Sequence, residues 1–170
     1  MDFSVEVEVQ SGWSSRDPSE AAVISREIAP LTWTQWFQAW IKHLNPQLSP
    51  IQSYCLGLRL TSDRDIQALN ATYRQQNRPT DVLAFAFLEG EAVPDQVWQS
   101  QPMELGDIVI SVETAMRQAQ THRHPAHQEI AWLATHGLLH LLGWDHPTDE
   151  ALQHMVHLQT CLLLEVGLLS

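Results

Sequence analysis

Three histidines near the carboxyl end of the sequence have the residue type and spacing that could bind one metal ion. They are His136, His140 and His146, within the segment HGLLHLLGWDH. Side chains four residues apart on a helix project from the same face, so His136 and His140 can reach a common ion. Gly143 allows the chain to turn sharply after the helix. That turn would bring His146 back toward the pair as a third ligand.

Three imidazoles predict a catalytic zinc site in preference to a structural one. Zinc held by three protein ligands in a tetrahedral site keeps one position open for water. The pKa of a water bound there falls to about 7, which supplies a hydroxide nucleophile at neutral pH. The segment therefore predicts a zinc-dependent hydrolase with one Zn2+ per chain, held on a buried helix and the turn that follows it.

Other interpretations of these histidines remain open. The helix is apolar nearly all round, so its histidines could be core residues that hydrogen-bond to the backbone. They could also form a closed structural zinc site, although no nearby cysteine supplies a fourth ligand. Asp145 could accept a hydrogen bond from a ligand histidine or cap a turn. The remaining histidines of this half are interpreted as solvated surface residues: His122, His124, His127, His154 and His157.

A zinc peptidase is the runner-up hypothesis. Metalloproteases with an H-E-x-x-H motif share this histidine spacing, and the glutamate after their first histidine is the general base. Gly137 stands at that place here. Because glycine cannot carry a proton, the standard peptidase mechanism lacks its base in this chain.

The strands and helices expected around the histidines indicate one α+β domain spanning residues 1–170. Alternating apolar and acidic residues predict a strand at Val5–Val9. Further strands are predicted at Tyr54–Thr61, Val82–Phe87 and Leu105–Val112. Helices are predicted from Thr32, from a cap at Ser62, from Glu113, from Pro125 to about Leu142, and from Thr148. The order β-α-β-α-β-β-α-α-α indicates a mixed sheet of about four strands with packed helices.

Two segments are predicted to be irregular, and two side chains outside them are predicted to be buried. Residues 11–30 read as a loop, and residues 88–103, which are acidic and contain proline, read as a loop or mobile lid. Tyr73 is expected on the buried face of the second helix, and Leu152 on that of the last helix.

Composition and charge exclude some classes of protein. The chain of 170 residues has a formal net charge of -11 and a single lysine, which argues against coating nucleic acid by bulk electrostatics. The apolar runs are too short to span a membrane, and the N-terminus lacks the features of a signal peptide. We therefore expect a cytoplasmic protein in which Cys55 and Cys161 are reduced thiols.

Arginines concentrate in one part of this acidic chain. Of the eight arginines, four fall within a stretch of about twenty residues: Arg59, Arg64, Arg74 and Arg78. A small basic patch of this kind is compatible with a nuclease, because the local field matters more to a phosphate backbone than the net charge.

Three segments, in order along the chain, resemble motifs of the YbeY family of metal-dependent endoribonucleases. They are NATYRQQNRPTDVLAF (70–85), LGDIVIS (105–111) and HGLLHLLGWDH (136–146). The sequence departs from the family pattern at Trp144, where tyrosine is usual, and at Ala84, where serine is usual. Neither position is expected to be a metal ligand, so the departures affect contacts to RNA and leave metal binding unaffected.

The resemblance implies roles for individual residues. His136, His140 and His146 match the zinc-binding histidines of the family, and Arg74 matches an arginine held to be needed for activity. Arg74 would clamp the scissile phosphate and offset its growing charge, so Arg74 and His136 are the predicted catalytic residues. Thr80 and Asp81 match a pair that organises the site. Contributions to an RNA channel are expected from Arg59, Arg78 and Trp144.

The resemblance also implies a cellular task. Members of the family are single-strand-specific endoribonucleases that act in 3′-end maturation of small-subunit (16S) ribosomal RNA and in ribosome quality control. The expected partners are therefore single-stranded ribosomal RNA, the small ribosomal subunit and assembly factors, with no DNA and no membrane. Attack by water and attack by the RNA 2′-hydroxyl both remain open. A non-catalytic, metal-stabilised assembly factor is a further alternative, which the acidity of the chain favours slightly.

Overall fold

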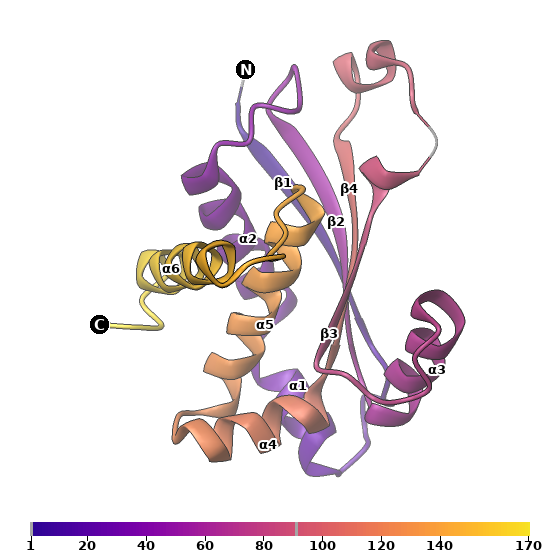
Figure 1. Ribbon diagram of the computed structural model, residues 1–170, viewed down its shortest axis with the longest axis vertical. Coiled ribbons are helices and arrows are strands. Elements are labelled where there is room, and N and C mark those ends of the chain that lie inside the picture. Colours follow the sequence, from indigo (N-terminus) through magenta and orange to yellow (C-terminus); the bar gives the residue numbers. More distant parts are fainter. Residues whose placement is uncertain (1, 91) are drawn as a thin grey trace.

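The computed structural model, which describes residues 2–90 and 92–170, has a four-stranded sheet with helices packed on it (Figure 1). The strands are β1 (Ser4–Ser11), β2 (Ser53–Thr61), β3 (Val82–Ala86) and β4 (Met103–Ser111). The helices are α1 (Glu20–Glu27), α2 (Pro30–Leu44), α3 (Asp63–Arg74), α4 (Val112–His122), α5 (Ala126–Leu141) and α6 (Asp149–Glu165). The predicted α+β class and mixed four-stranded sheet are confirmed.

The sheet has the strand order β1-β2-β4-β3. Strands β1, β2 and β4 are parallel, and β3 runs antiparallel to β4 at the edge of the sheet. On one face, Leu58 of β2 and Ile108 of β4 belong to the main apolar core. On the other face, α3 contributes Ile66 to a smaller cluster with Val109. In Figure 1, α3 lies on the opposite side of the sheet from α5.

Helix α5 packs closely on the sheet because it carries a glycine at the contact. A Cβ atom added at Gly137 would lie 2.7 Å from Cγ2 of Ile108, closer than two carbons can approach. The contact therefore sets the distance between α5 and β4. The contact also explains why position 137 is glycine and not the glutamate of the H-E-x-x-H peptidases. A glutamate there would force α5 away from the sheet.

Helix α1 was not predicted, and the expectation that residues 11–30 are irregular is wrong for Glu20–Glu27. Ser19 caps this helix, and its hydroxyl accepts a hydrogen bond from the Ala22 backbone N–H. The buried face consists of small side chains, Ala21, Ala22 and Ser25. Such a face produces no periodic pattern of large apolar residues, which is the signal by which a helix is recognised in a sequence.

Other expectations about burial need correction. Tyr73 is 58% exposed and Leu152 is 41% exposed, so neither lies on a buried face. The segment predicted as a loop or lid contains two 3-10 turns, Phe87–Glu89 and Asp95–Gln99. Trp98 within it is part of the main apolar core, which anchors this segment, and it also packs edge-on against Phe87.

The two cysteines are free, and each is only partly buried. Burial raises the pKa of the Cys55 thiol to about 12, with a further contribution from the neighbouring Glu104 carboxylate. No helix in residues 2–90 and 92–170 combines the length and apolar character needed to cross a bilayer.

Candidate metal centre

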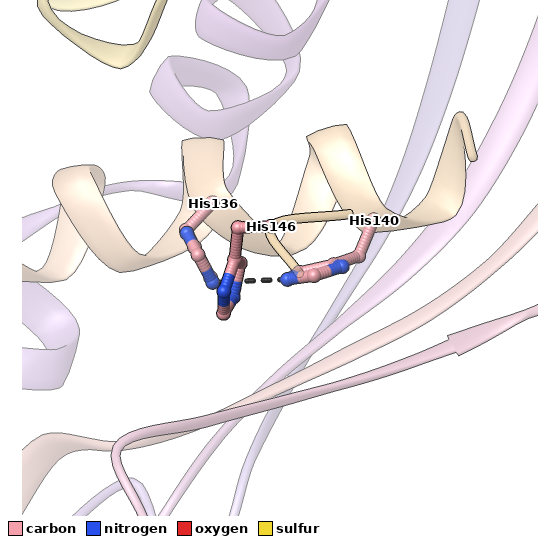
Figure 2. Close-up of side chains that lie close together, drawn as sticks. All are labelled: His136, His140 and His146. Atoms are coloured by element: carbon pink, nitrogen blue, oxygen red, sulfur yellow. Dashed lines mark hydrogen bonds between the residues drawn. The ribbon is translucent and has the colours of Figure 1, made fainter. Parts of the chain in front are cut away.

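The three predicted histidines converge (Figure 2). His136 and His140 project from the same face of α5, and the chain after the helix returns His146 to them. Nε2 of His140 lies 3.0 Å from Nε2 of His136. The ring of His146 lies 5.5 Å from that of His136 and 5.4 Å from that of His140, between centroids. One nitrogen from each ring lies within 4.8 Å of the other two, so the trio could hold a metal ion.

A compact turn returns His146 to the helix. Gly143 has φ 94°, a conformation that glycine adopts without the penalty of a side chain. The N–H of Trp144 donates to the carbonyl of Leu139 over 2.9 Å, which closes the end of α5. Asp145 accepts a hydrogen bond from the backbone N–H of His146 over 2.8 Å. Asp145 therefore caps the turn, which is one of the two roles expected for it.

The surroundings keep two of the imidazoles neutral. Burial lowers the pKa of His136, and nearby His146 lowers it further, whereas Gln159 and Asp81 act in the opposite direction. Burial likewise lowers the pKa of His140, with added effects from His136 and His146. Neutral imidazole is the form that binds a metal, so the site is poised for a cation at neutral pH.

Gln159 of α6 orients His136, and the sequence analysis did not identify it. Its side-chain amide N–H donates to the carbonyl of Trp132 over 3.2 Å, which fixes the direction of the amide. The amide oxygen then faces Nδ1 of His136 at 3.3 Å. Nδ1 must therefore carry the proton, which leaves Nε2 free for an ion. The sequence signal that could have identified it is its position within the apolar stripe of α6. In the structure Gln159 is 1% exposed.

The trio opens into a pocket of about 320 Å³ between α5 and the edge strand β3. Arg74 also lines this pocket, although α3 lies on the other face of the sheet. It reaches round the edge because Arg74 is the last residue of α3. Its Nη2 donates to the carbonyl of Ala84 over 2.8 Å, and its guanidinium lies over the ring of Phe85. The structure thus brings together all four residues predicted for the site.

Asp81 forms part of the pocket wall at the start of β3. Its carboxylate accepts hydrogen bonds from the backbone N–H of Val82 over 2.8 Å and from Nε2 of Gln118 over 3.2 Å. Its carbonyl accepts from the N–H of Ser111 over 2.9 Å. These bonds hold the carboxylate in a single orientation. Thr80 precedes it, with the hydroxyl 3.5 Å from the same carboxylate.

The three residues expected along an RNA channel are not among those that line this pocket. Arg59 points from the opposite face of the sheet, where it pairs with Asp65 at 3.7 Å and lines a groove of about 460 Å³ with Tyr73. Trp144 stacks edge-on against His154. The carbonyl of Arg78 accepts a hydrogen bond from the side chain of Asn70. The larger groove is apolar for most of its lining, and the histidines open into the smaller pocket.

Three of the five remaining histidines are exposed as predicted, whereas His127 is partly buried. His154 and His157 are exposed on α6, and His122 is exposed at the end of α4. His124 differs from the expectation of a solvated surface residue, because only 24% of its side chain is exposed and Nε2 contacts the buried carboxylate of Glu129. Together with His122, these residues form a second group of metal-ligating side chains.

Comparisons with known proteins show which family the sequence resembles. A family model described as Endoribonuclease YbeY matches residues 21–167. A protein named Endoribonuclease YbeY from Acaryochloris marina is 60% identical over 139 residues, which cover 82% of this chain and 79% of the relative. Another of the same name from Trichormus variabilis is 48% identical, covering 96% of this chain and 95% of the relative.

A solved structure supports the fold. The solution structure of TM1509 from Thermotoga maritima aligns with a TM-score of 0.53 at 21% identity, covering 94% of this chain and 88% of that one. At this identity the likeness concerns the arrangement of helices and strands alone.

Proposed function

Because the chain belongs to the Endoribonuclease YbeY family, we propose that it is a zinc-dependent endoribonuclease that cleaves single-stranded RNA. The names of its relatives support nuclease activity. The observation that carries the proposal is the convergence of three imidazoles and one guanidinium on the same pocket. Three imidazoles favour a catalytic ion because they leave one position open, and an arginine beside them supplies a partner for phosphate.

The donor set fits zinc, and we assign His136, His140 and His146 to one Zn2+ per chain. Two nitrogens bound to one zinc at about 2.0–2.1 Å in tetrahedral geometry would lie roughly 3.3 Å apart. The observed separation of Nε2 atoms in His136 and His140 is 3.0 Å. When bound, the ion would lower the pKa of a water molecule and polarise a phosphoryl oxygen.

Arg74 is assigned to the scissile phosphate. The contacts to the carbonyl of Ala84 and the ring of Phe85 hold its guanidinium in place and leave several N–H donors free. A planar guanidinium can bind two phosphate oxygens at once, and its charge offsets the negative charge that grows in the transition state. Its fixed position means that little reorganisation is needed when the substrate binds.

The charge of the pocket explains why RNA binding would depend on the metal. Asp81 and Glu89 line the pocket with Arg74, so its ionised side chains sum to a negative charge when the histidines are neutral. A phosphodiester would be repelled by such a lining, because like charges destabilise one another at short range. A dication held by the trio would reverse the sign. Asp81, fixed by its hydrogen bonds, would orient the groups around the phosphate without reacting.

Single-stranded RNA is the proposed substrate form. A strand must bend to bring one phosphate into a pocket between a helix and a sheet edge, and a stacked duplex resists that bend. We further propose that the target is 16S ribosomal RNA in 3′-end maturation and ribosome quality control, in the cytoplasm, with the small subunit and assembly factors as partners. The net charge of -11 favours delivery by such partners over bulk attraction to RNA.

The test is an assay of end-labelled single-stranded RNA from the 3′ region of the small-subunit ribosomal RNA. Zinc-loaded protein should cleave it, and Arg74→Ala with the same zinc content should cleave it at least about 100-fold more slowly. The same sequence as a duplex and as DNA provides the controls. Failure of the zinc-loaded native protein to cleave would overturn the proposal, and the non-catalytic assembly factor would then be the better hypothesis. Analysis of product ends distinguishes the mechanisms, since a 2′,3′-cyclic phosphate requires attack by the 2′-hydroxyl.

A further inference from the structure

A second group of metal-ligating side chains lies where α4 meets α5. His122 is the last residue of α4, His124 lies in the connection, and Glu129 is in the first turn of α5. Nδ1 of His122 lies 3.4 Å from Oε2 of Glu129, and Nε2 of His124 contacts the same oxygen. These three atoms all lie within 4.8 Å of one another. They are separate from the trio that the proposed function uses.

The backbone of the corner brings the two imidazoles together. Arg123 adopts a left-handed conformation with φ 58°, which reverses the chain directly after α4. The N–H of His124 then donates to the carbonyl of Ala119 over 3.1 Å, the bond that closes this type of helix end. The ring of His124 consequently lies beside that of His122, with centroids 5.5 Å apart.

The carboxylate of Glu129 is too deeply buried to be explained as surface charge. The residue is 2% exposed. A buried carboxylate is costly unless it is paired, because it loses its hydration. Both imidazoles approach a single oxygen of this carboxylate, and with neutral rings the group keeps one uncompensated negative charge. A divalent cation would more than offset that charge, with one positive charge left over, and would bind all three donor atoms.

We propose that His122, His124 and Glu129 form a second binding site for a first-row divalent metal ion of the Zn2+ class. Two imidazole nitrogens and one carboxylate oxygen are a donor set that zinc accepts, with a position left for water. The side chain of His122 is 56% exposed, which gives an ion a path from solvent. The carbonyl end of α4 adds a favourable partial negative charge.

A neighbouring glutamine can set the tautomer of His124. Nε2 of Gln128 faces Nδ1 of His124 at 3.5 Å, so binding of the ion would require the amide to turn its oxygen toward the ring. The oxygen and nitrogen of an amide exchange places by a simple rotation. With the oxygen toward Nδ1, that nitrogen keeps its proton and Nε2 is free to bind the ion, as Gln159 arranges for His136 in the trio.

The ion at this second site fastens the end of α4 to the start of α5. Glu129 and His136 are separated by two helical turns, about 10 Å along the axis of α5. A metal at the corner would therefore hold the amino end of the helix that carries His136 and His140 without entering their pocket. The second site contributes to the stability of that helix through binding to the folded state alone.

The test counts ions in a background without the trio. In the full-length His140→Ala variant, equilibrium dialysis against Zn2+ followed by elemental analysis should find about one ion per chain. Adding Glu129→Gln should weaken that binding by at least about 100-fold. Loss of a residue that only hydrogen-bonds to a metal ligand already lowers metal affinity by about 10–100-fold. The matched control adds His154→Ala and His157→Ala, two exposed histidines of α6, and should keep the ion.

Two results would overturn the proposal. One is a His140→Ala variant that binds no zinc although it is folded. The other is equal loss of zinc from the Glu129→Gln variant and the α6 control, which would indicate adventitious binding to surface histidines. If Glu129→Gln does not fold, His122→Ala serves instead, because this side chain is exposed, and unchanged affinity there also refutes the site. The ion count does not depend on RNA cleavage, so its outcome is independent of the proposed function.

Discussion

Helix α5 has metal-ligating side chains at both ends, and the two ends differ in charge and in access. At its carboxyl end three imidazoles face a pocket that also contains Arg74. At its amino end the group contains the carboxylate of Glu129, which is buried under two rings. A set of neutral ligands leaves an ion its full positive charge, whereas a carboxylate offsets half of it.

Because of this difference, the trio is suited to catalysis and the α4–α5 corner to stabilising the fold. Polarising a phosphate requires a strong positive charge and an open approach, and a second cation stabilises the transition state. The proposed ion would supply the first charge, the pocket the approach, and Arg74 the second cation. The group at the α4–α5 corner has a buried anion that itself requires compensation. We therefore expect substitutions at the trio to act on catalysis, and those at the corner to act on stability.

The largest expected effect comes from breaking the trio. His140→Ala should abolish zinc binding in the pocket and lower RNA cleavage by at least about 1,000-fold, the upper range for loss of one electrostatic contact. His124→Ala, at the corner, should lower cleavage by less than about 10-fold. Cleavage rates at saturating zinc provide the measurement. Similar losses in both variants would show that the two groups do not divide their roles in this way.

The next largest effect distinguishes the role of Arg74 from that of the metal ion. Arg74→Ala should lower the cleavage rate by about 100–1,000-fold, because it removes one charged contact to the phosphate. Zinc content should stay the same, since Arg74 bonds to the carbonyl of Ala84 and not to a histidine. Arg74→Lys restores the charge without the planar fork and should recover part of the rate. Loss of zinc from Arg74→Ala would instead assign Arg74 a role in building the trio.

Much of this architecture could be predicted from the sequence. The spacing of His136, His140 and His146 predicted their convergence because a helix and a glycine turn are local structures. The apolar residues of β2 and β4 predicted these strands, and most of them are buried in the packed sheet. Helix α1 was missed because its buried face consists of alanine and serine, which are too small to mark a periodic pattern.

Contacts between distant segments could not be predicted from spacing. Arg74 enters the pocket from the opposite face of the sheet, which depends on β3 being the edge strand. Gln159 reaches His136 from another helix, and a buried glutamine alone does not reveal its partner. The contact of His124 with Glu129 requires the left-handed turn at Arg123. Family resemblance identified Arg74 where physical patterns could not.

A smaller effect would test the orientation of the trio. Gln159→Leu removes the oxygen that accepts the Nδ1 proton of His136, and should weaken zinc binding at the trio by about 10–100-fold. Gln159→Glu keeps an acceptor and should recover much of that affinity. Zinc binding at the corner should not change in either variant. Equal affinity in native protein and Gln159→Leu would limit this glutamine to packing between α5 and α6.

The smallest expected effect is the response of the metal-free protein to acid. Burial lowers the pKa of His136 and of His140 in the folded state, so below about pH 6.5 the unfolded chain binds protons that the folded chain does not. Their contribution to stability is therefore complete at neutral pH and is lost as the pH falls from about 6.5 toward the lowered values. Each histidine can account for at most about 1.4 kcal/mol per pH unit.

Urea unfolding at pH 7.5 and 5.5 in the presence of a chelator measures this loss. Replacing His136 and His140 by leucine should flatten the pH dependence, because leucine has no proton to gain. Glu129→Gln should keep it, since the shifted groups lie at the other end of α5. If the dependence instead follows Glu129, then the corner, and not the trio, is the acid-sensitive end of the helix.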